Sequence, residues 1–162
     1  MSPRHTIIDS PLDDLTVVAD GDALTGLYFR HHWYRPALDT FGPRADDGFE
    51  EVSRQLKEFF AGERTEFELP LRADGDDFQR SVWAEIARIP YGATVTYGEM
   101  AAALGDPSIA RDVGAAVGRN PLSILVACHR VVGKDGKLTG YAGGLKRKEF
   151  LLELEKPSNR LW

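Results

Sequence analysis

The pair Cys128-His129 is the part of this 162-residue chain best suited to chemistry. Cys128 is the only cysteine, so it can form neither an internal disulfide nor a cysteine-based zinc site. A thiolate is a strong nucleophile, and histidine is the usual side chain for taking a proton near neutral pH. The alternative is a buried structural thiol, because free cysteine packs as a small hydrophobic residue. The dipeptide alone favours that alternative.

The second of two consecutive predicted helices has one nearly bare face. Ala110, Gly114, Ala115 and Gly118 lie three or four residues apart, and Arg111 projects beside them. Glycine weakens a helix interior by about 1 kcal/mol relative to alanine, so such a face needs a reason. It either packs closely against another helix of the protein or enters a narrow groove, such as the minor groove of DNA, about 6 Å wide. The sequence leaves these two interpretations about even.

A mainly helical second half must position these side chains. Thr96 is a predicted N-cap, and Asp106-Pro107 predicts the start of the next helix. Two helices joined by a short turn with glycine indicate a helix-turn-helix. The segment 122–132 is predicted to be extended and Asp135-Gly136 to form a tight turn. The predicted helices cover 78–89, 97–104, 107–118 and 145–155.

The first half predicts a small α/β unit. Its pattern indicates three strands, at 6–8, 15–19 and 24–29, followed by a helix at 49–60 with Gly62 at its end. Alternating apolar residues at 67–71 indicate a further short strand. The acidic stretch 73–77 is the best candidate for a linker, so we expect one domain at 1–77 and a second at 78–162.

Composition limits the function classes. There is no run of 18 apolar residues and no signal-peptide core, so we expect a cytoplasmic protein without a membrane partner. The net charge of −5 averages two unlike halves. Residues 1–77 carry 8 basic and 17 acidic residues, net −9, whereas 78–162 carry 12 and 8, net +4. This asymmetry suggests that the second half meets an anion, although a solvated surface explains a net of +4 about as well.

Four motifs follow one another along the second half of the chain. They are Tyr91-Gly92-x4-Tyr97, Arg111-x-Val113-Gly114-x-Ala116-x3-Asn120-Pro121, Cys128-His129-Arg130-Val131, and Gly140-Tyr141-x-Gly143-Gly144 with Arg147-Lys148-Glu149. In this order and spacing they resemble the O6-alkylguanine-DNA alkyltransferase family, densely over 78–155 and more loosely before it. The resemblance implies a ribonuclease H-like α/β N-terminal domain, with a small antiparallel sheet plus helix, before a mainly α C-terminal domain with a helix-turn-helix.

The resemblance implies a role for each motif residue at the thiol. Cys128 would accept the alkyl group from O6 of guanine, or from O4 of thymine, in one irreversible turnover. His129 would take the thiol proton through a water, and Glu149 would hold His129 in position. Tyr97 would help to rotate the nucleotide and would donate a hydrogen bond to the leaving guanine. Asn120 would fix the turn between the recognition helix and the active-site segment. Because neighbours on a strand point to opposite faces, we expect a bend at Cys128 as well as the water.

The resemblance also implies how DNA is bound. The second helix would enter the minor groove of double-stranded DNA containing O6-alkylguanine, and the damaged nucleotide would flip out. Arg111 would fill the gap, while Ala110, Gly114, Ala115 and Tyr97 approach the DNA. We expect a monomer in solution that can cluster on DNA. The residues expected to line the substrate pocket are Tyr141, Val131, Ala142 and Gly143.

Three departures and three alternatives accompany the resemblance. Ala127 stands where the family usually has proline, Asp112 stands beside Arg111, and Ala142 replaces a serine found in some members. We expect no metal and no cofactor. A lesion-binding protein without repair activity is the main alternative, and such relatives replace the cysteine. A Cys-His hydrolase and a major-groove helix-turn-helix regulator are weaker, because neither an acyl pocket nor base-reading side chains are evident.

Overall fold

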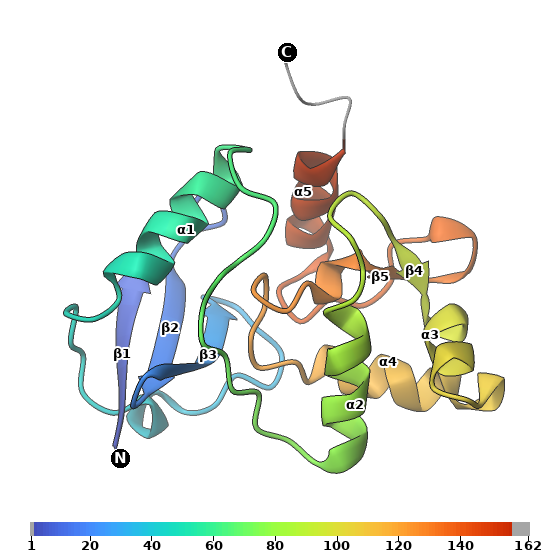
Figure 1. The fold of residues 1–162 in the computed structure, drawn as a ribbon, viewed down its shortest axis with the longest axis horizontal. Helices are drawn as coiled ribbons and strands as arrows, with labels where there is room; N and C mark the ends of the chain where they lie inside the picture. Colours follow the sequence, from blue (N-terminus) through green and yellow to red (C-terminus); the bar gives the residue numbers. More distant parts are fainter. Residues whose placement is uncertain (1, 157–162) are drawn as a thin grey trace.

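The fold begins with a three-stranded antiparallel sheet, ordered β1-β2-β3 (Figure 1). The computed structural model describes residues 2–156, so the end of the predicted second domain, 157–162, lies outside the described residues. All three predicted strands are confirmed. They are β1 (Pro3–Ile8), β2 (Leu15–Asp20) and β3 (Ala23–Phe29).

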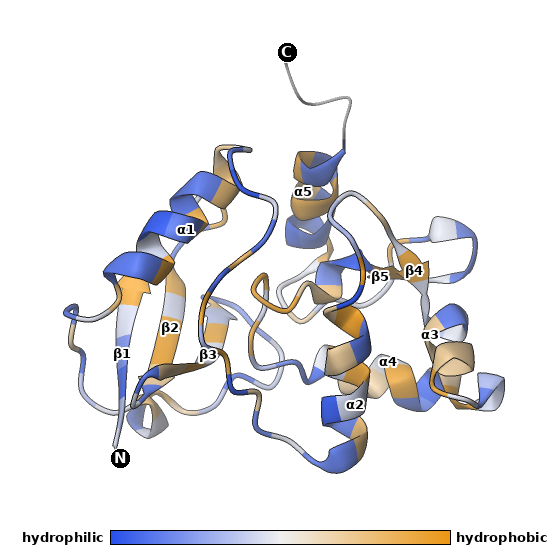
Figure 2. Cartoon of the chain, in the orientation of Figure 1, coloured by the Kyte–Doolittle hydropathy of each residue, from blue (hydrophilic) through white to orange (hydrophobic). Residues whose placement is uncertain are grey.

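One helix, α1 (Glu50–Phe60), packs on this sheet, as predicted. Its apolar residues Val52, Leu56 and Phe59 are buried, whereas its outer face is hydrophilic (Figure 2). The spacing of three or four residues places those side chains on one face, which explains why the periodicity identified the helix.

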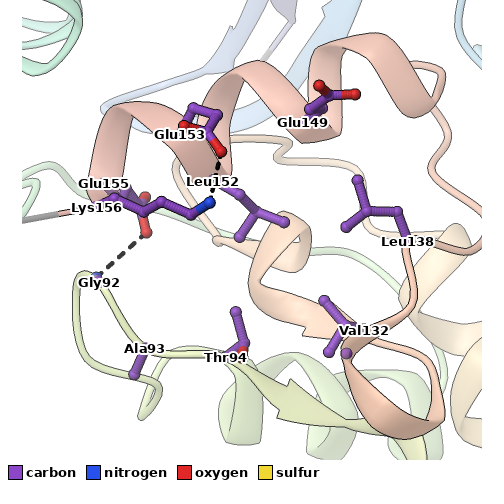
Figure 3. Close-up of a pocket in the computed structure, with 11 residues that line it drawn as sticks. Gly92, Ala93, Thr94, Val132, Leu138, Glu149, Leu152, Glu153, Glu155 and Lys156 are labelled. Atoms are coloured by element: carbon purple, nitrogen blue, oxygen red, sulfur yellow. Dashed lines mark hydrogen bonds and ion pairs between the residues drawn. The ribbon is translucent and has the colours of Figure 1, made fainter. Parts of the chain in front are cut away.

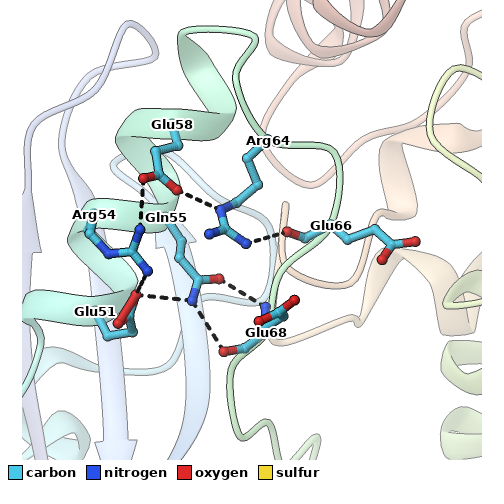
Figure 4. A network of polar contacts seen from close by, with 7 residues as sticks. All are labelled: Glu51, Arg54, Gln55, Glu58, Arg64, Glu66 and Glu68. Atoms are coloured by element: carbon cyan, nitrogen blue, oxygen red, sulfur yellow. Dashed lines mark hydrogen bonds and ion pairs between the residues drawn. The ribbon is translucent and has the colours of Figure 1, made fainter.

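The strand predicted at 67–71 is wrong, because side chains of α1 satisfy the backbone there. Gln55 Nε2 donates to Glu68 O at 3.2 Å, and Gln55 Oε1 accepts from Glu68 N at 2.9 Å (Figure 4). Arg64 Nε also donates to Glu58 Oε1 of the same helix, at 2.8 Å. Only an isolated bridge between Leu24 and Leu71 joins the segment to the sheet.

The second half is helical, and the ends of its helices agree with prediction to within three residues. Residues 107–109, predicted to start an α-helix, form a separate 3-10 turn capped by Asp106, and the α-helix begins at Ala110. Asp76 caps the first helix and Thr96 caps the second, each in a capping box with the residue three positions later. A two-stranded parallel pair, β4 (Val95–Thr96) and β5 (Val131–Val132), lies between helices. The helices are α2 (Asp77–Ile86), α3 (Tyr97–Ala103), α4 (Ala110–Gly118) and α5 (Leu145–Glu155).

The segment 122–132 is not extended as predicted. It contains turns, a left-handed residue at Ile124 (φ 72°) and a 3-10 turn, Cys128–Arg130, before β5. Asn120 stabilises the turns, because its Oδ1 accepts from Leu122 N at 3.0 Å and its Nδ2 donates to Val126 O at 2.9 Å. A buried apolar run is compatible with a strand or a folded loop, so the pattern could not distinguish them.

One apolar core spans both halves of the chain. The free edge of β3 holds the segment that leads to Cys128, because Leu27 N donates to Pro121 O at 2.8 Å and Leu27 O accepts from Ser123 N at 3.3 Å. The division into domains at residue 77 therefore stays a prediction. Among the helices described within 2–156, none is long and apolar enough to cross a membrane.

Candidate active site

Cys128 begins a 3-10 turn and is almost fully buried. The turn supplies the bend that was expected at this point. It also turns the backbone so that Cys128, His129 and Arg130 are all buried together. The sheet edge at β3 and the side chain of Asn120 hold the residues that precede the turn. The thiol therefore lies on a well-supported loop inside the molecule.

His129 belongs to a buried chain of polar contacts. Its Nε2 donates to Glu155 Oε2 at 2.7 Å, and Arg130 binds both oxygens of the same carboxylate, at 2.8 and 3.0 Å. Burial alone would raise the pKa of Glu155, but the hydrogen bonds from His129 and Arg130 outweigh it and lower that pKa to about 2. Glu155 is therefore ionised, which assigns the ring proton to Nε2.

The other ring nitrogen of His129 is left free to act as a base. Nδ1 is buried and has no protein partner within hydrogen-bond distance. Burial lowers the pKa of His129, and this effect exceeds the opposite effect of Glu155. The imidazole is therefore neutral near pH 7, with Nδ1 as its acceptor.

The expectation that Glu149 holds His129 is wrong. Glu149 is exposed, while Glu155 makes the contact. Six residues of an α-helix turn through about 600°, so the two carboxylates lie on different faces of α5. Glu149 lines a cavity of about 410 Å³ whose walls include Leu138 and Leu152, and Glu155 also lines this cavity (Figure 3). Cys128 does not line that cavity.

Lys148 is a site residue that sequence reasoning missed. It is fully buried, and its Nζ donates to Val131 O at 2.6 Å and to Thr139 O at 2.9 Å. Burial lowers its pKa to about 8, so the ammonium remains largely charged at neutral pH. Lys148, Leu151 and Glu155 are the buried residues of α5. Their spacing of three and four residues was the available signal, but two charged residues obscured it.

The surroundings of Cys128 act in opposite directions on the pKa of its thiol. Burial raises the pKa of Cys128, while a hydrogen bond from Asn120 and the positive charge of Lys148 act to lower it. The thiol is therefore mostly protonated at neutral pH and needs a base for reaction.

Two tyrosines lie near the thiol. Burial raises the pKa of Tyr141 well above its ordinary value, and the charge of Cys128 and the hydrogen bond between the two residues act in the same direction. Burial also raises the pKa of Tyr97, whose hydroxyl donates to Thr139 O at 3.4 Å. Both phenols are therefore protonated and can donate a hydrogen bond.

The remaining predicted pocket residues lie on the loops around these tyrosines. Val131 follows the 3-10 turn, and its carbonyl is bound by Lys148. Ala142 and Gly143 are buried just after Tyr141, and the Gly143 carbonyl accepts from Arg147 at 2.9 Å. No group of three or more potential metal ligands occurs among residues 2–156.

The bare face of α4 is partly explained by packing. A Cβ built at Gly114 would lie 3.7 Å from the Tyr97 ring, and one at Gly118 would lie 3.9 Å from Tyr34. Ala110 is half-buried, while Arg111 and Ala115 are exposed. The face therefore accommodates two aromatic rings and still presents an accessible helix surface with an arginine at one end.

Comparison with known families defines the class of protein that this fold and site represent. A family described as 6-O-methylguanine DNA methyltransferase, ribonuclease-like domain, matches residues 4–73, and the corresponding DNA binding domain matches 77–157. The chain belongs to the 6-O-methylguanine DNA methyltransferase family. The expected α/β N-terminal unit followed by a helical C-terminal unit is confirmed.

Particular relatives match nearly the whole chain. A methylated-DNA--protein-cysteine methyltransferase of Mycobacterium bovis is 49% identical, over 94% of this chain and 92% of the relative. One of Methanosarcina acetivorans is 44% identical, over 93% and 97%. The structure of Mycobacterium tuberculosis OGT in complex with DNA superposes with a TM-score of 0.87 at 47% identity, covering 94% of this chain and 92% of that one.

Proposed function

We propose that this protein repairs DNA directly, by moving the alkyl group from O6 of guanine to the sulfur of Cys128. The observation that carries the proposal is the buried polar chain His129–Glu155–Arg130 beside the single thiol, within the DNA-binding half of this family. The same transfer from O4 of thymine belongs to the proposal.

Activation of the thiol begins with a proton transfer. We infer that a water carries the Cys128 proton to Nδ1 of His129, which is the free acceptor of the ring. Glu155 holds the Nε2 proton and stabilises the imidazolium that forms. Arg130 keeps this carboxylate ionised throughout. Lys148 and Asn120 stabilise the thiolate, which is otherwise disfavoured by burial.

The transfer itself is a displacement at the saturated carbon of the alkyl group. The thiolate sulfur forms a new bond to that carbon while the carbon–O6 bond breaks, and its electron pair stays with guanine. Tyr97 is the proposed hydrogen-bond donor to O6 of the departing guanine, because its raised pKa keeps the phenol protonated. The guanine anion takes one proton from water, and His129 returns the thiol proton to water, so that protons balance. Tyr141, Val131, Ala142 and Gly143 are proposed to line the pocket.

The product explains why each molecule reacts once. A thioether has no easy hydrolytic exit, and the chain holds no second cysteine to take the group on. The reaction is therefore stoichiometric. The alternative of lesion binding without repair is not favoured, because Cys128 is present together with its activating chain.

DNA binding is assigned to α4. We propose that its small-residue face, including Ala110, Gly114 and Ala115, enters the minor groove and that Arg111 fills the space of the flipped nucleotide. The partner is double-stranded DNA containing O6-alkylguanine. A monomer in solution, clustering on DNA and a cytoplasmic location also remain proposals.

The test measures how many guanines each protein molecule repairs. The protein is mixed with excess duplex containing O6-methylguanine, and repaired guanine is measured after the reaction has stopped. We expect one guanine restored per protein molecule, and none with Cys128→Ser. Continued turnover, or no repair at all, would contradict the proposed function.

A further inference from the structure

Two large aromatic side chains are exposed in the connection that follows β3. Trp33 is 54% exposed and Tyr34 is 59% exposed. They belong to the N-terminal half, but they lie against elements of the C-terminal half. Exposed aromatic rings in adjacent positions are unusual unless they meet a partner.

Trp33 lies beside the loop that carries Tyr141. Its backbone N–H donates to Ala142 O at 2.8 Å, and its ring lies 3.9 Å from the position of a Cβ at Gly140. Tyr97 binds the carbonyl of Thr139, the preceding residue. Trp33 and Tyr97 therefore flank the same short segment of the active-site loop, each from a different half of the chain.

Tyr34 lies against the C-terminal end of α4. Its ring approaches Gly118, and the guanidinium carbon of Arg119 lies 3.7 Å from the ring centroid. Tyr34 has φ 58°, in the left-handed region that bulky residues rarely adopt. Such strain persists only where the surroundings fix the conformation, and it is often found at functional sites.

These three side chains extend the face of α4 that is assigned to DNA. Arg119 is the exposed residue that directly follows α4, and its charge lies above the ring of Tyr34. Aromatic rings that bind exposed bases, combined with cations that bind phosphates, are the usual means of holding a single strand. Flipping moves the nucleotide, with the adjoining part of its strand, out of the duplex stack and toward the protein.

We propose that Trp33, Tyr34 and Arg119 form a second DNA contact surface, which binds the strand carrying the alkylated nucleotide. The two rings contact the part of that strand that leaves the duplex, outside the gap that Arg111 fills, and Arg119 contacts a phosphate. This inference rests on the proposed function. It gives the N-terminal half a direct part in binding the substrate, in addition to supporting the segment before Cys128.

The first test is DNA affinity in a Cys128→Ser background, with a duplex carrying O6-methylguanine. We expect Trp33→Ala with Tyr34→Ala to weaken binding about tenfold or more. Leu38→Ala is the matched control, since Leu38 is 61% exposed in the same connection and carries no aromatic ring. Arg119→Gln should reduce the slope of log affinity against log salt by about 0.9, the contribution of one phosphate. Affinity unchanged by the double variant would overturn the proposal.

The second test separates DNA binding from chemistry with Cys128 intact. The rate of transfer from free O6-benzylguanine, which needs no DNA contact, should stay within about twofold in the Tyr34→Ala protein, well under one tenfold step, because Tyr34 contacts Gly118 and Arg119 and not the loop around Tyr141. An equal loss with the free base and the duplex would indicate disturbed folding and overturn the proposal. The proposal would also be overturned if the variant changed the self-association of the protein but left its DNA affinity unchanged. Failure of the unmodified protein to restore guanine in the duplex would instead contradict the proposed function.

Discussion

At the scale of single residues, the ionised Glu155 connects the proposed activation of the thiol with the stability of the fold. Its pKa of about 2 in the folded protein lies below the ordinary 4.5. A depressed carboxyl pKa contributes stability above pH 4.5 that is lost as the pH falls toward 2. Acid should therefore weaken the fold and the activating chain together, through the same carboxylate.

Replacing each carboxylate by an amide distinguishes the role of Glu155 from that of Glu149. We expect Glu155→Gln to slow transfer from free O6-benzylguanine by about 10- to 100-fold, because His129 loses the partner that orients it. The acid limb of the pH profile should move to lower pH, since the carboxylate raises the pKa of His129. Glu149→Gln is the exposed control and should react normally. Equal effects of both variants would contradict the assignment.

Removing the charge of Lys148 should change how the transfer rate depends on pH. Below about pH 8 its ammonium is charged and lowers the pKa of the Cys128 thiol. The variant Lys148→Met removes that charge, so the rise in transfer rate with pH should shift to higher pH. The exposed Lys146 provides the control Lys146→Met. The measurement is the rate with the free base across pH, and an unshifted profile would exclude this role.

At the scale of elements, periodic and capped segments could be predicted, whereas folded loops could not. The pattern of apolar residues located α1 and α2, and Thr96 correctly marked the start of α3. The loop after α4 is buried and apolar, so its turns depend on contacts of Asn120 that periodicity does not contain. The same limit hid the inward face of α5, where Lys148 and Glu155 replace apolar residues.

Two small residues of helix α4 separate its stability from its proposed binding of DNA. The space at Gly114 accepts a methyl group, since a Cβ would lie 3.7 Å from the Tyr97 ring, so Gly114→Ala should stabilise the protein by up to about 1 kcal/mol through helix propensity. Ala115 is exposed on the helix surface that is proposed to enter the minor groove, so Ala115→Leu should bind duplex DNA more weakly. Chemical denaturation tests the first effect and a binding titration the second, and unchanged DNA affinity of the Ala115→Leu protein would refute the assigned face.

At the scale of the whole molecule, the two halves share one core and one functional surface. The strand edge at Leu27 holds the segment before Cys128, and the connection after β3 contacts the loop around Tyr141. The sequence predicted two units, but it contained no signal for the contacts between them, because these join residues far apart in the chain. The arrangement makes the N-terminal half part of the active site's support.

Leu27 provides the test of this shared support. The side chain is fully buried, so Leu27→Ala should cost about 2–5 kcal/mol of unfolding free energy. Because the core is continuous, far-UV circular dichroism and tryptophan fluorescence should report one coincident unfolding transition in urea. Two separate transitions would show that the halves are stable independently.

The most direct measurement of the central claim is the mass of the peptide that contains Cys128, after reaction with duplex DNA carrying O6-methylguanine. The account predicts one added methyl group on the Cys128 sulfur in every reacted molecule. It predicts that the Glu155→Gln protein gains the same group more slowly. A methyl group on another residue, or restored guanine with an unmodified Cys128, would contradict it.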